Sequence, residues 1–122
     1  MRIFKTKTSG RDLKKASLTD AELIGAAEEV NRGEYEADLG GDVFKKRVAR
    51  SGAGKSGGFR VILFFRKDER LFFGYVFAKS NLANIADDRL KWFRKVAKEY
   101  LEYTDKELEA RIKEGWIEEI VP

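Results

Sequence analysis

The sequence contains neither cysteine nor histidine. The absence of cysteine excludes disulfides, thiolate metal sites and cysteine nucleophiles. The absence of histidine removes the usual general base at neutral pH and the commonest metal ligand. Any catalysis must therefore use lysine, arginine, tyrosine, carboxylates or hydroxyls.

Long apolar segments are absent as well. The first five residues lack the apolar stretch of a signal peptide, and no run approaches the roughly 18 apolar residues of a membrane span. We therefore expect a cytoplasmic protein that does not associate with membranes. The length of 122 residues predicts a single domain over residues 1–122, and 43% hydrophobic with 38% charged residues is typical of a globular chain.

Positive charge is concentrated in one part of the sequence. Residues 1–42 carry seven Lys or Arg and nine Asp or Glu, whereas residues 43–67 carry eight Lys or Arg and no acid. Such a segment repels itself unless an anion relieves it, which predicts a polyanionic partner. The alternative is that these are ordinary solvated strand residues.

Helices are predicted on both sides of this basic segment. The sequence Thr19-Asp20-Ala21-Glu22 is a capping box that opens an amphipathic helix over residues 20–32. A second capping box at Thr104 opens a shorter helix that ends near Gly115. Residues 84–101 are expected to form a longer helix capped by Asn84, and residues 9–16 a weaker helical turn.

Strands are predicted in the basic segment and at the N-terminus. Residues 43–50, 59–66 and 70–79 are rich in Val, Ile, Phe and Tyr, and their short links favour an antiparallel meander. Residues 2–5 read as a first strand, and residues 116–121 as a last strand or an extended tail. The predicted fold class is α+β: an antiparallel sheet, made of a three-strand meander plus an N-terminal strand, with helices packed on one face.

Residues 52–58 contain two glycine patterns that resemble nucleotide-binding loops. A P-loop, however, needs glycine where Ala49 stands, and both motifs need a helix where the strand-like residues 59–65 follow. We therefore expect a glycine hairpin that brings Lys55 close to a phosphate. A mobile turn with an incidental lysine is the alternative.

Alternation along the strands sorts the side chains. Residues 59, 61, 63 and 65 form an apolar core face, while Arg60 and Arg66 bracket two apolar residues on the other face, a surface suited to phosphates and bases. Tyr75 shares a face with Phe77 and Lys79. If these faces coincide with the Lys45 and Arg47 side of the first strand, a concave cationic surface forms, and hairpin register decides whether they do.

Each of these residues has a structural alternative. Tyr75 and Phe77 can belong to the core. Arg60 can be a salt-bridged structural arginine. Lys46 and Arg50 share parity with apolar residues, so either they reach out from the edge of the core or the strand contains a bulge. Trp92 can contact a partner or be covered by the final helix or the C-terminal tail.

The chain resembles the RelE/HigB-type toxins of bacterial type II toxin–antitoxin systems. The resemblance is carried by residues 45–50, the glycine-lysine-glycine hairpin that ends in Arg60 (residues 52–60), the segment Phe73-Gly74-Tyr75-Val76-Phe77-Ala78-Lys79, and residues 83–85. It covers nearly the whole chain in element order and is strongest over residues 38–84.

The resemblance implies a ribosome-dependent endoribonuclease that enters the decoding site, beside 16S rRNA, and cleaves messenger RNA. In this family the RNA 2′-hydroxyl attacks the adjacent phosphate, so no protein nucleophile, metal or cofactor is implied. A neutralising antitoxin, commonly of the helix-turn-helix type, is implied as the partner.

The resemblance also carries site residues onto this sequence. Arg60 is expected to hold the scissile phosphate, Lys79 to act as acid or base, and Tyr75 to act as base or stack on a base, with Lys55 as the fourth catalytic candidate. The expected RNA-binding cations are Lys45, Lys46, Arg47, Arg50, Arg66 and Lys67. Two other functions remain open: a non-catalytic RNA-binding module, and a small protein whose sheet binds an acidic peptide.

Overall fold

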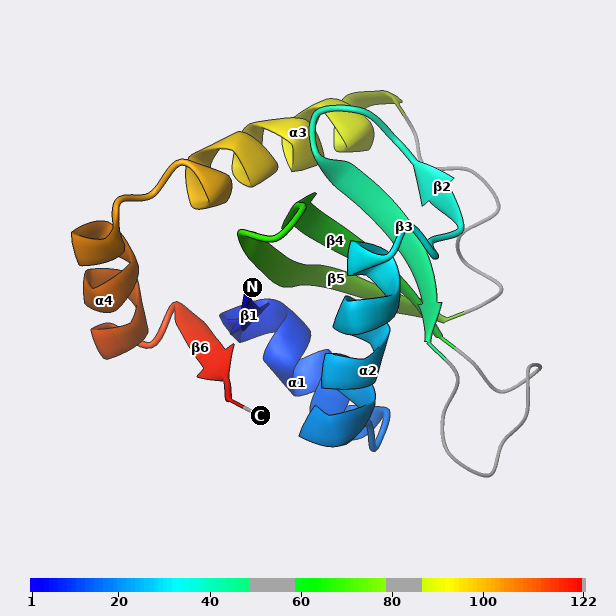
Figure 1. Cartoon of the computed structure of the whole chain (residues 1–122), viewed down its shortest axis with the longest axis horizontal. Helices are drawn as coiled ribbons and strands as arrows, with labels where there is room; N and C mark the ends of the chain where they lie inside the picture. Colours follow the sequence, from blue (N-terminus) through cyan, green and yellow to red (C-terminus); the bar gives the residue numbers. More distant parts are fainter. Residues whose placement is uncertain (49–58, 79–86, 122) are drawn as a thin grey trace.

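The computed structural model describes residues 1–48, 59–78 and 87–121. Within these ranges, four helices surround a six-stranded sheet with the strand order β2-β3-β4-β5-β1-β6 (Figure 1). Neighbouring strands are antiparallel except β1 and β5, which run parallel. The predicted α+β class is confirmed.

Most expected elements are found close to their expected bounds. The strands are β1 (Arg2–Thr6), β2 (Ala37–Asp38), β3 (Val43–Val48), β4 (Phe59–Arg66), β5 (Arg70–Ala78) and β6 (Ile117–Ile120). The helices are α1 (Lys7–Lys15), α2 (Asp20–Asn31), α3 (Asp87–Leu101) and α4 (Asp105–Lys113). The meander β3-β4-β5 and the N-terminal strand are confirmed, and the C-terminal segment is a strand that pairs with β1.

Three helices begin at a threonine that closes a capping box. Thr19 and Thr104 do so with Glu22 and Glu107, as predicted. Thr6 closes a third box with Ser9 and opens α1, which is a full helix of nine residues where only a weak turn was expected. The sequence missed it because the third residue is serine rather than the usual Glu or Gln. The predicted cap at Asn84 lies outside the described residues.

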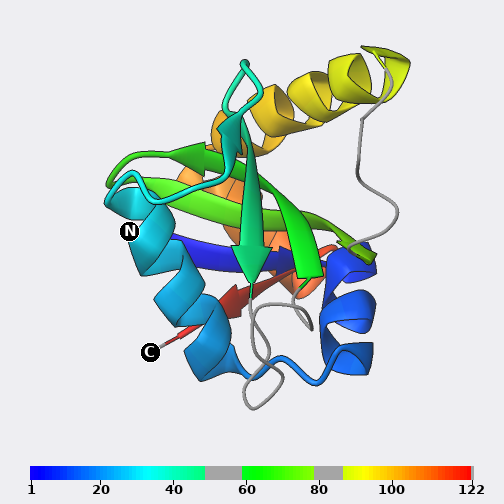
Figure 2. The ribbon, with the colours of Figure 1, turned by 90° about the vertical axis from the view of Figure 1, so that its right-hand side faces the viewer.

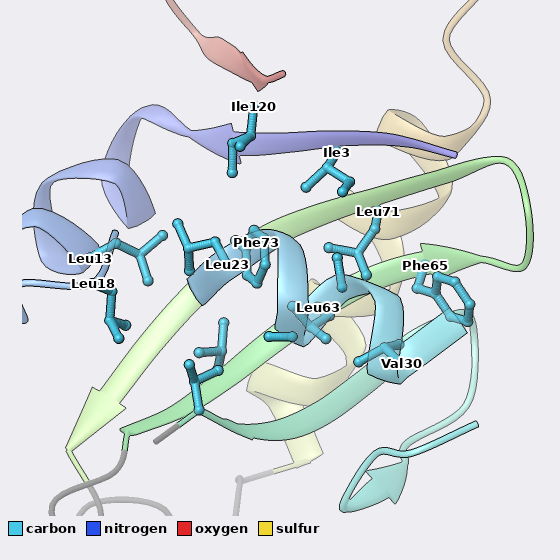
Figure 3. Packing of buried hydrophobic residues seen from close by; sticks show 14 of the residues in the cluster. Ile3, Leu13, Leu18, Leu23, Val30, Leu63, Phe65, Leu71, Phe73 and Ile120 are labelled. Atoms are coloured by element: carbon cyan, nitrogen blue, oxygen red, sulfur yellow. The ribbon is translucent and has the colours of Figure 1, made fainter. Parts of the chain in front are cut away.

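The helices lie on both faces of the sheet, so the expectation that they pack on one face is wrong. Figure 2 shows α3 on one side of the sheet and α1 and α2 on the other. The α1–α2 side covers Leu63 and Phe65 of β4 (Figure 3), and Val61 belongs to the same cluster. The α3–α4 side covers Ile62 and Phe64. Because β4 is apolar on both faces, each face needs its own helical cover.

A bulge in β5 decides which residues share the α3 side. The pairing of β4 with β5 shifts between Ile62 and Leu63, so Gly74 is left between the residues that pair with them. A side chain at Gly74 would place its Cβ 2.6 Å from Cζ of Phe64. The bulge therefore depends on glycine, and it turns Tyr75 toward the same face as Phe64.

The described ranges contain neither a candidate membrane-spanning helix nor a candidate metal site. None of the helices there combines the length and the apolar character that a bilayer crossing requires. The same residues contain no group of three or more side chains placed to hold a metal ion.

Candidate functional site

Register brings the cations of the central strands together. Arg47 of β3 lies directly opposite Arg60 of β4, and Arg60 lies opposite Phe77 of β5. Lys45 is two residues before Arg47 and therefore points to the same side. We call this surface, made of Lys45, Arg47, Arg60, Tyr75 and Phe77, the basic face. The coincidence of faces that the sequence left open is realised for these five residues.

The basic face is continuous with the core under α3. The rings of Tyr75 and Phe77 are in tilted contact at a centroid distance of 4.6 Å and pack, partly buried, against the α3 cluster. The alternative that Tyr75 and Phe77 belong to the core therefore holds in part, because both side chains lie at its edge. Ile62 and Phe64 lie beneath α3 rather than in solvent, so only the two ends of this side of β4, at Arg60 and Arg66, are open to a ligand.

Helix α3 adds a cation that the sequence did not single out. The guanidinium of Arg89 lies 4.7 Å from the ring centroid of Tyr75 and 5.4 Å from that of Phe77. Such cation–π contacts fix the position of a charge at the surface. Arg89 lies five residues after the expected cap at Asn84, and its place in the sequence gives no sign of this contact, because the placement depends on how α3 crosses the sheet.

Arg60 is held by a carboxylate. Its Nε lies 2.9 Å from Oε2 of Glu36, whose Oε1 is 3.6 Å from Nζ of Lys45. The Arg60 side chain is 17% exposed. Its Nη1 and Nε of Arg47 are buried and have no hydrogen-bond partner among the described residues. Unsatisfied donors of this kind are costly, and like charges directly opposite on a sheet repel, so the pair favours an anion.

Glu36 is a functional candidate that sequence reasoning missed. The basic segment spans residues 43–67, whereas Glu36 lies before it, just ahead of β2. The hairpin from β2 to β3 brings it back, with its backbone N–H donating to the carbonyl of Lys45. The sign of this role in the sequence was a carboxylate in a loop, seven residues before a basic strand.

The basic segment is also less unbalanced than its composition suggests. Lys46 lies 3.7 Å from Oε1 of Glu29, and Nε of Arg66 lies 3.1 Å from Oδ2 of Asp42. With Glu36, these acids from the negative N-terminal third partly neutralise the described cations. The charge pattern alone is therefore weaker support for a polyanionic partner than the composition of residues 43–67 suggests.

The structure does not bring every expected site residue to the basic face. Lys46 lies on the opposite side of β3, where it also donates to the carbonyl of Glu34. Arg66 and the exposed Lys67 lie at the β4–β5 turn, about 20 Å along the strand from Arg60. Arg47 also borders a hollow beside α2. Lys55, Lys79 and Arg50 lie outside the described residues, and all of these roles remain predictions.

The clearest pKa shifts among tyrosines lie elsewhere, between α3 and α4. Burial and the neighbouring Glu99 carboxylate raise the pKa of Tyr103 to about 12, and they raise the pKa of Tyr100 as well. The Tyr103 hydroxyl donates to Glu99 at 3.1 Å. Both tyrosines are therefore neutral at physiological pH.

Fold and site together define a small α+β protein whose antiparallel meander presents cations and aromatic rings at one end. The family model described as the RelE toxin of the RelE/RelB toxin–antitoxin system matches residues 1–120. The chain therefore belongs to the RelE toxin family, as its resemblance to RelE/HigB-type toxins predicted. A search of curated proteins found no match.

Proposed function

We propose that residues 1–122 act as one cytoplasmic toxin domain that cleaves messenger RNA on the ribosome, beside 16S rRNA, and so inhibits translation. A cognate antitoxin, of the helix-turn-helix type, would neutralise it. Family membership supports a toxin with an antitoxin partner. The observation that carries the proposal is the placement of Arg47 directly opposite Arg60 on a face edged by aromatic rings.

The first step is binding of the scissile phosphate. Arg60 and Arg47 can share one phosphate through charge-assisted hydrogen bonds, which also relieves their mutual repulsion. A phosphate on Arg60 takes the place of Glu36 on the guanidinium. Because the extra negative charge of the transition state develops on that phosphate, the same contacts lower the barrier.

The second step is the transfer of the phosphate ester. Glu36, released beside the substrate, accepts the proton of the RNA 2′-hydroxyl. The 2′-oxygen bonds to phosphorus, the bond from phosphorus to the 5′-oxygen breaks, and Lys79 or Lys55 protonates the leaving oxygen. The products are a 2′,3′-cyclic phosphate and a 5′-hydroxyl. This chemistry draws on no metal or cofactor, and Tyr75 and Phe77 offer rings to the flanking bases.

The decisive variant is Arg60→Ala. Purified protein is added to translating ribosomes, and messenger cleavage is mapped from the new 5′ ends. We expect the rate to fall about 10²- to 10³-fold, the usual effect of removing a donor to a developing charge. Arg32→Ala is the matched control, because Arg32 is an exposed arginine paired with Glu34 on the α2 side.

The outcomes separate the candidate functions. Full activity of Arg60→Ala would contradict the proposed site. Ribosome binding by the parent without cleavage would favour a non-catalytic RNA-binding module. Binding that resists ribonuclease but is lost in high salt would favour an acidic peptide as the ligand.

A further inference from the structure

Both tryptophans of the chain lie exposed at one hollow. Trp92 of α3 is 56% exposed and Trp116, just before β6, is 55% exposed. The final helix therefore does not cover Trp92. Few large apolar side chains of the described residues are as exposed, and such aromatic clusters mark binding surfaces.

The hollow has the size and walls of a pocket for a flat ring. It encloses about 270 Å³ on the α3 side of the sheet. Tyr75, Tyr100, Trp92 and Trp116 supply aromatic surface, and the exposed Thr8 supplies a hydroxyl. The hydroxyl of Thr6 is engaged with Ser9 in the capping box. Aromatic side chains with hydroxyls nearby can stack on a nucleobase and bond to its edge.

Charge around the hollow favours an anionic ring compound such as a nucleotide over a cationic or neutral one. Nζ of Lys7 lies 5.3 Å from the ring centroid of Trp116, and Lys7 lines the hollow. A second cation, the guanidinium of Arg89, lies over the ring of Tyr75, which also lines the hollow. No carboxylate is among the described residues that line this hollow. A phosphate attached to the base would therefore meet Lys7 in this hollow, whereas Glu99 belongs to a neighbouring hollow that shares Trp92 and Trp116.

The hollow adjoins the basic face. Tyr75 belongs to both, and Gly74, the bulge residue beside it, forms part of the hollow. Across the sheet, Arg60 of β4 is followed by Phe77 and Tyr75 of β5, then by Thr6 of β1 and Trp116 before β6. A single RNA strand that crosses β3, β4 and β5 at Arg60 would continue into the hollow.

We propose that this hollow is a nucleobase-binding subsite that stacks one base of the RNA, next to the scissile phosphate, between Trp92 and Trp116. The subsite rests on the proposed function for its substrate. It explains why the two tryptophans are exposed, and it adds positions at β1, α3 and β6 to a site that the sequence placed only on the central strands.

Tryptophan emission tests the subsite directly, because both indoles of the chain lie there. Full-length protein is titrated with 2′-O-methyl RNA hexanucleotides of each base, which lack the attacking hydroxyl and are not cleaved. We expect emission to be quenched on binding. Trp92→Leu and Trp116→Leu should each weaken binding roughly 5- to 100-fold, the range found for loss of one stacking partner. Each variant also leaves one indole to report on the other wall.

Tyr35→Leu is the matched control, since Tyr35 is an exposed aromatic that packs on Phe44 on the α2 side. Its affinity should equal that of the parent. Absence of quenching by all four hexanucleotides at millimolar concentration, or unchanged affinity in both tryptophan variants, would overturn the subsite. If the tryptophan emission were quenched only by a protein that co-purifies with the chain, the hollow would be a protein interface and the proposed subsite would be wrong.

Messenger cleavage on ribosomes separates this proposal from the function on which it rests. Cleavage that depends on Arg60 but not on either tryptophan refutes the subsite and keeps the nuclease. Stacking of hexanucleotides by a protein that never cleaves refutes the nuclease and keeps the subsite.

Discussion

At the residue scale, Arg60 and Glu36 form the pair on which the chemistry depends. The sequence identified Arg60 because an arginine in an apolar strand is costly to bury unpaired. It also named a salt-bridged arginine as the alternative, and the 2.9 Å contact to Glu36 shows that a salt bridge exists. The two readings are compatible, because a phosphate can replace a carboxylate on a guanidinium.

Glu36→Gln tests the role of the carboxylate. If Glu36 accepts the 2′-hydroxyl proton, the cleavage rate should fall about 10²- to 10⁴-fold, while binding of 2′-O-methyl RNA should be unchanged or tighter because a negative charge is lost. Single-turnover cleavage and binding assays measure the two effects. Glu29→Gln, which removes the charge that faces Lys46, is the control. Equal cleavage by Glu36→Gln and the parent would show that Glu36 only neutralises cations.

Gly74→Ala tests the bulge. Its Cβ would approach the Phe64 ring to 2.6 Å and the Ile62 carbonyl to 3.2 Å, so the strand or the ring must move. We expect a loss of about 1–3 kcal/mol in the free energy of unfolding, measured with denaturant. Gly25→Ala in helix α2 is the control with the opposite expected effect. A Cβ at Gly25 would meet no atom within 4 Å, so the substitution should raise the free energy of unfolding by about 1 kcal/mol. Equal effects of the two substitutions would contradict the packing described for the bulge.

At the scale of elements, the sequence predicted helices and strands better than their layers. Two of the three capping boxes and the β3-β4-β5 meander carry local patterns that can be read directly. The layers depend on which helix packs on which face, and the two apolar faces of β4 were the only sign. The two arginines favoured a ligand surface on one face of β4, whereas an apolar strand of this kind is better explained by burial of both faces.

The C-terminal strand is joined to β1 by an ion pair with a pH dependence. Nε and Nη2 of Arg2 contact the two carboxylate oxygens of Glu119 at 2.9 and 2.8 Å, and this lowers the pKa of Glu119 below 4.5. A lowered pKa stabilises the fold above pH 4.5, and that contribution is lost as the pH falls through the folded-state value.

Glu119→Gln should therefore cost about 1 kcal/mol or less at pH 7, and this cost should shrink below pH 4.5. Denaturant unfolding of the parent and the variant between pH 7 and pH 3 measures it. A stability difference between the parent and Glu119→Gln that grows as the pH falls would contradict the stabilising role given to the Arg2–Glu119 ion pair.

At the scale of the whole molecule, the site combines distant parts of the chain. The sequence placed Lys45, Arg47 and Arg60 on the strands but could not fix their common face, because a one-residue change of register reverses it. Glu36 and Arg89 could not be found from the strands, since a hairpin and a helix crossing bring them there. Acidic residues of the N-terminal third, Glu29 and Asp42, form ion pairs with cations of the basic segment and neutralise part of its charge.

The central claim is that messenger RNA lies on the basic face, on the α3 side of the sheet. The most direct measurement is photo-crosslinking of 4-thiouridine-labelled messenger to the protein on ribosomes, with crosslinked residues located by mass spectrometry. Crosslinks are predicted at Tyr75, Phe77 and neighbouring residues of β4 and α3 that surround Arg60. Crosslinks confined to α1, α2 and the α2-facing side of β3 would contradict the account.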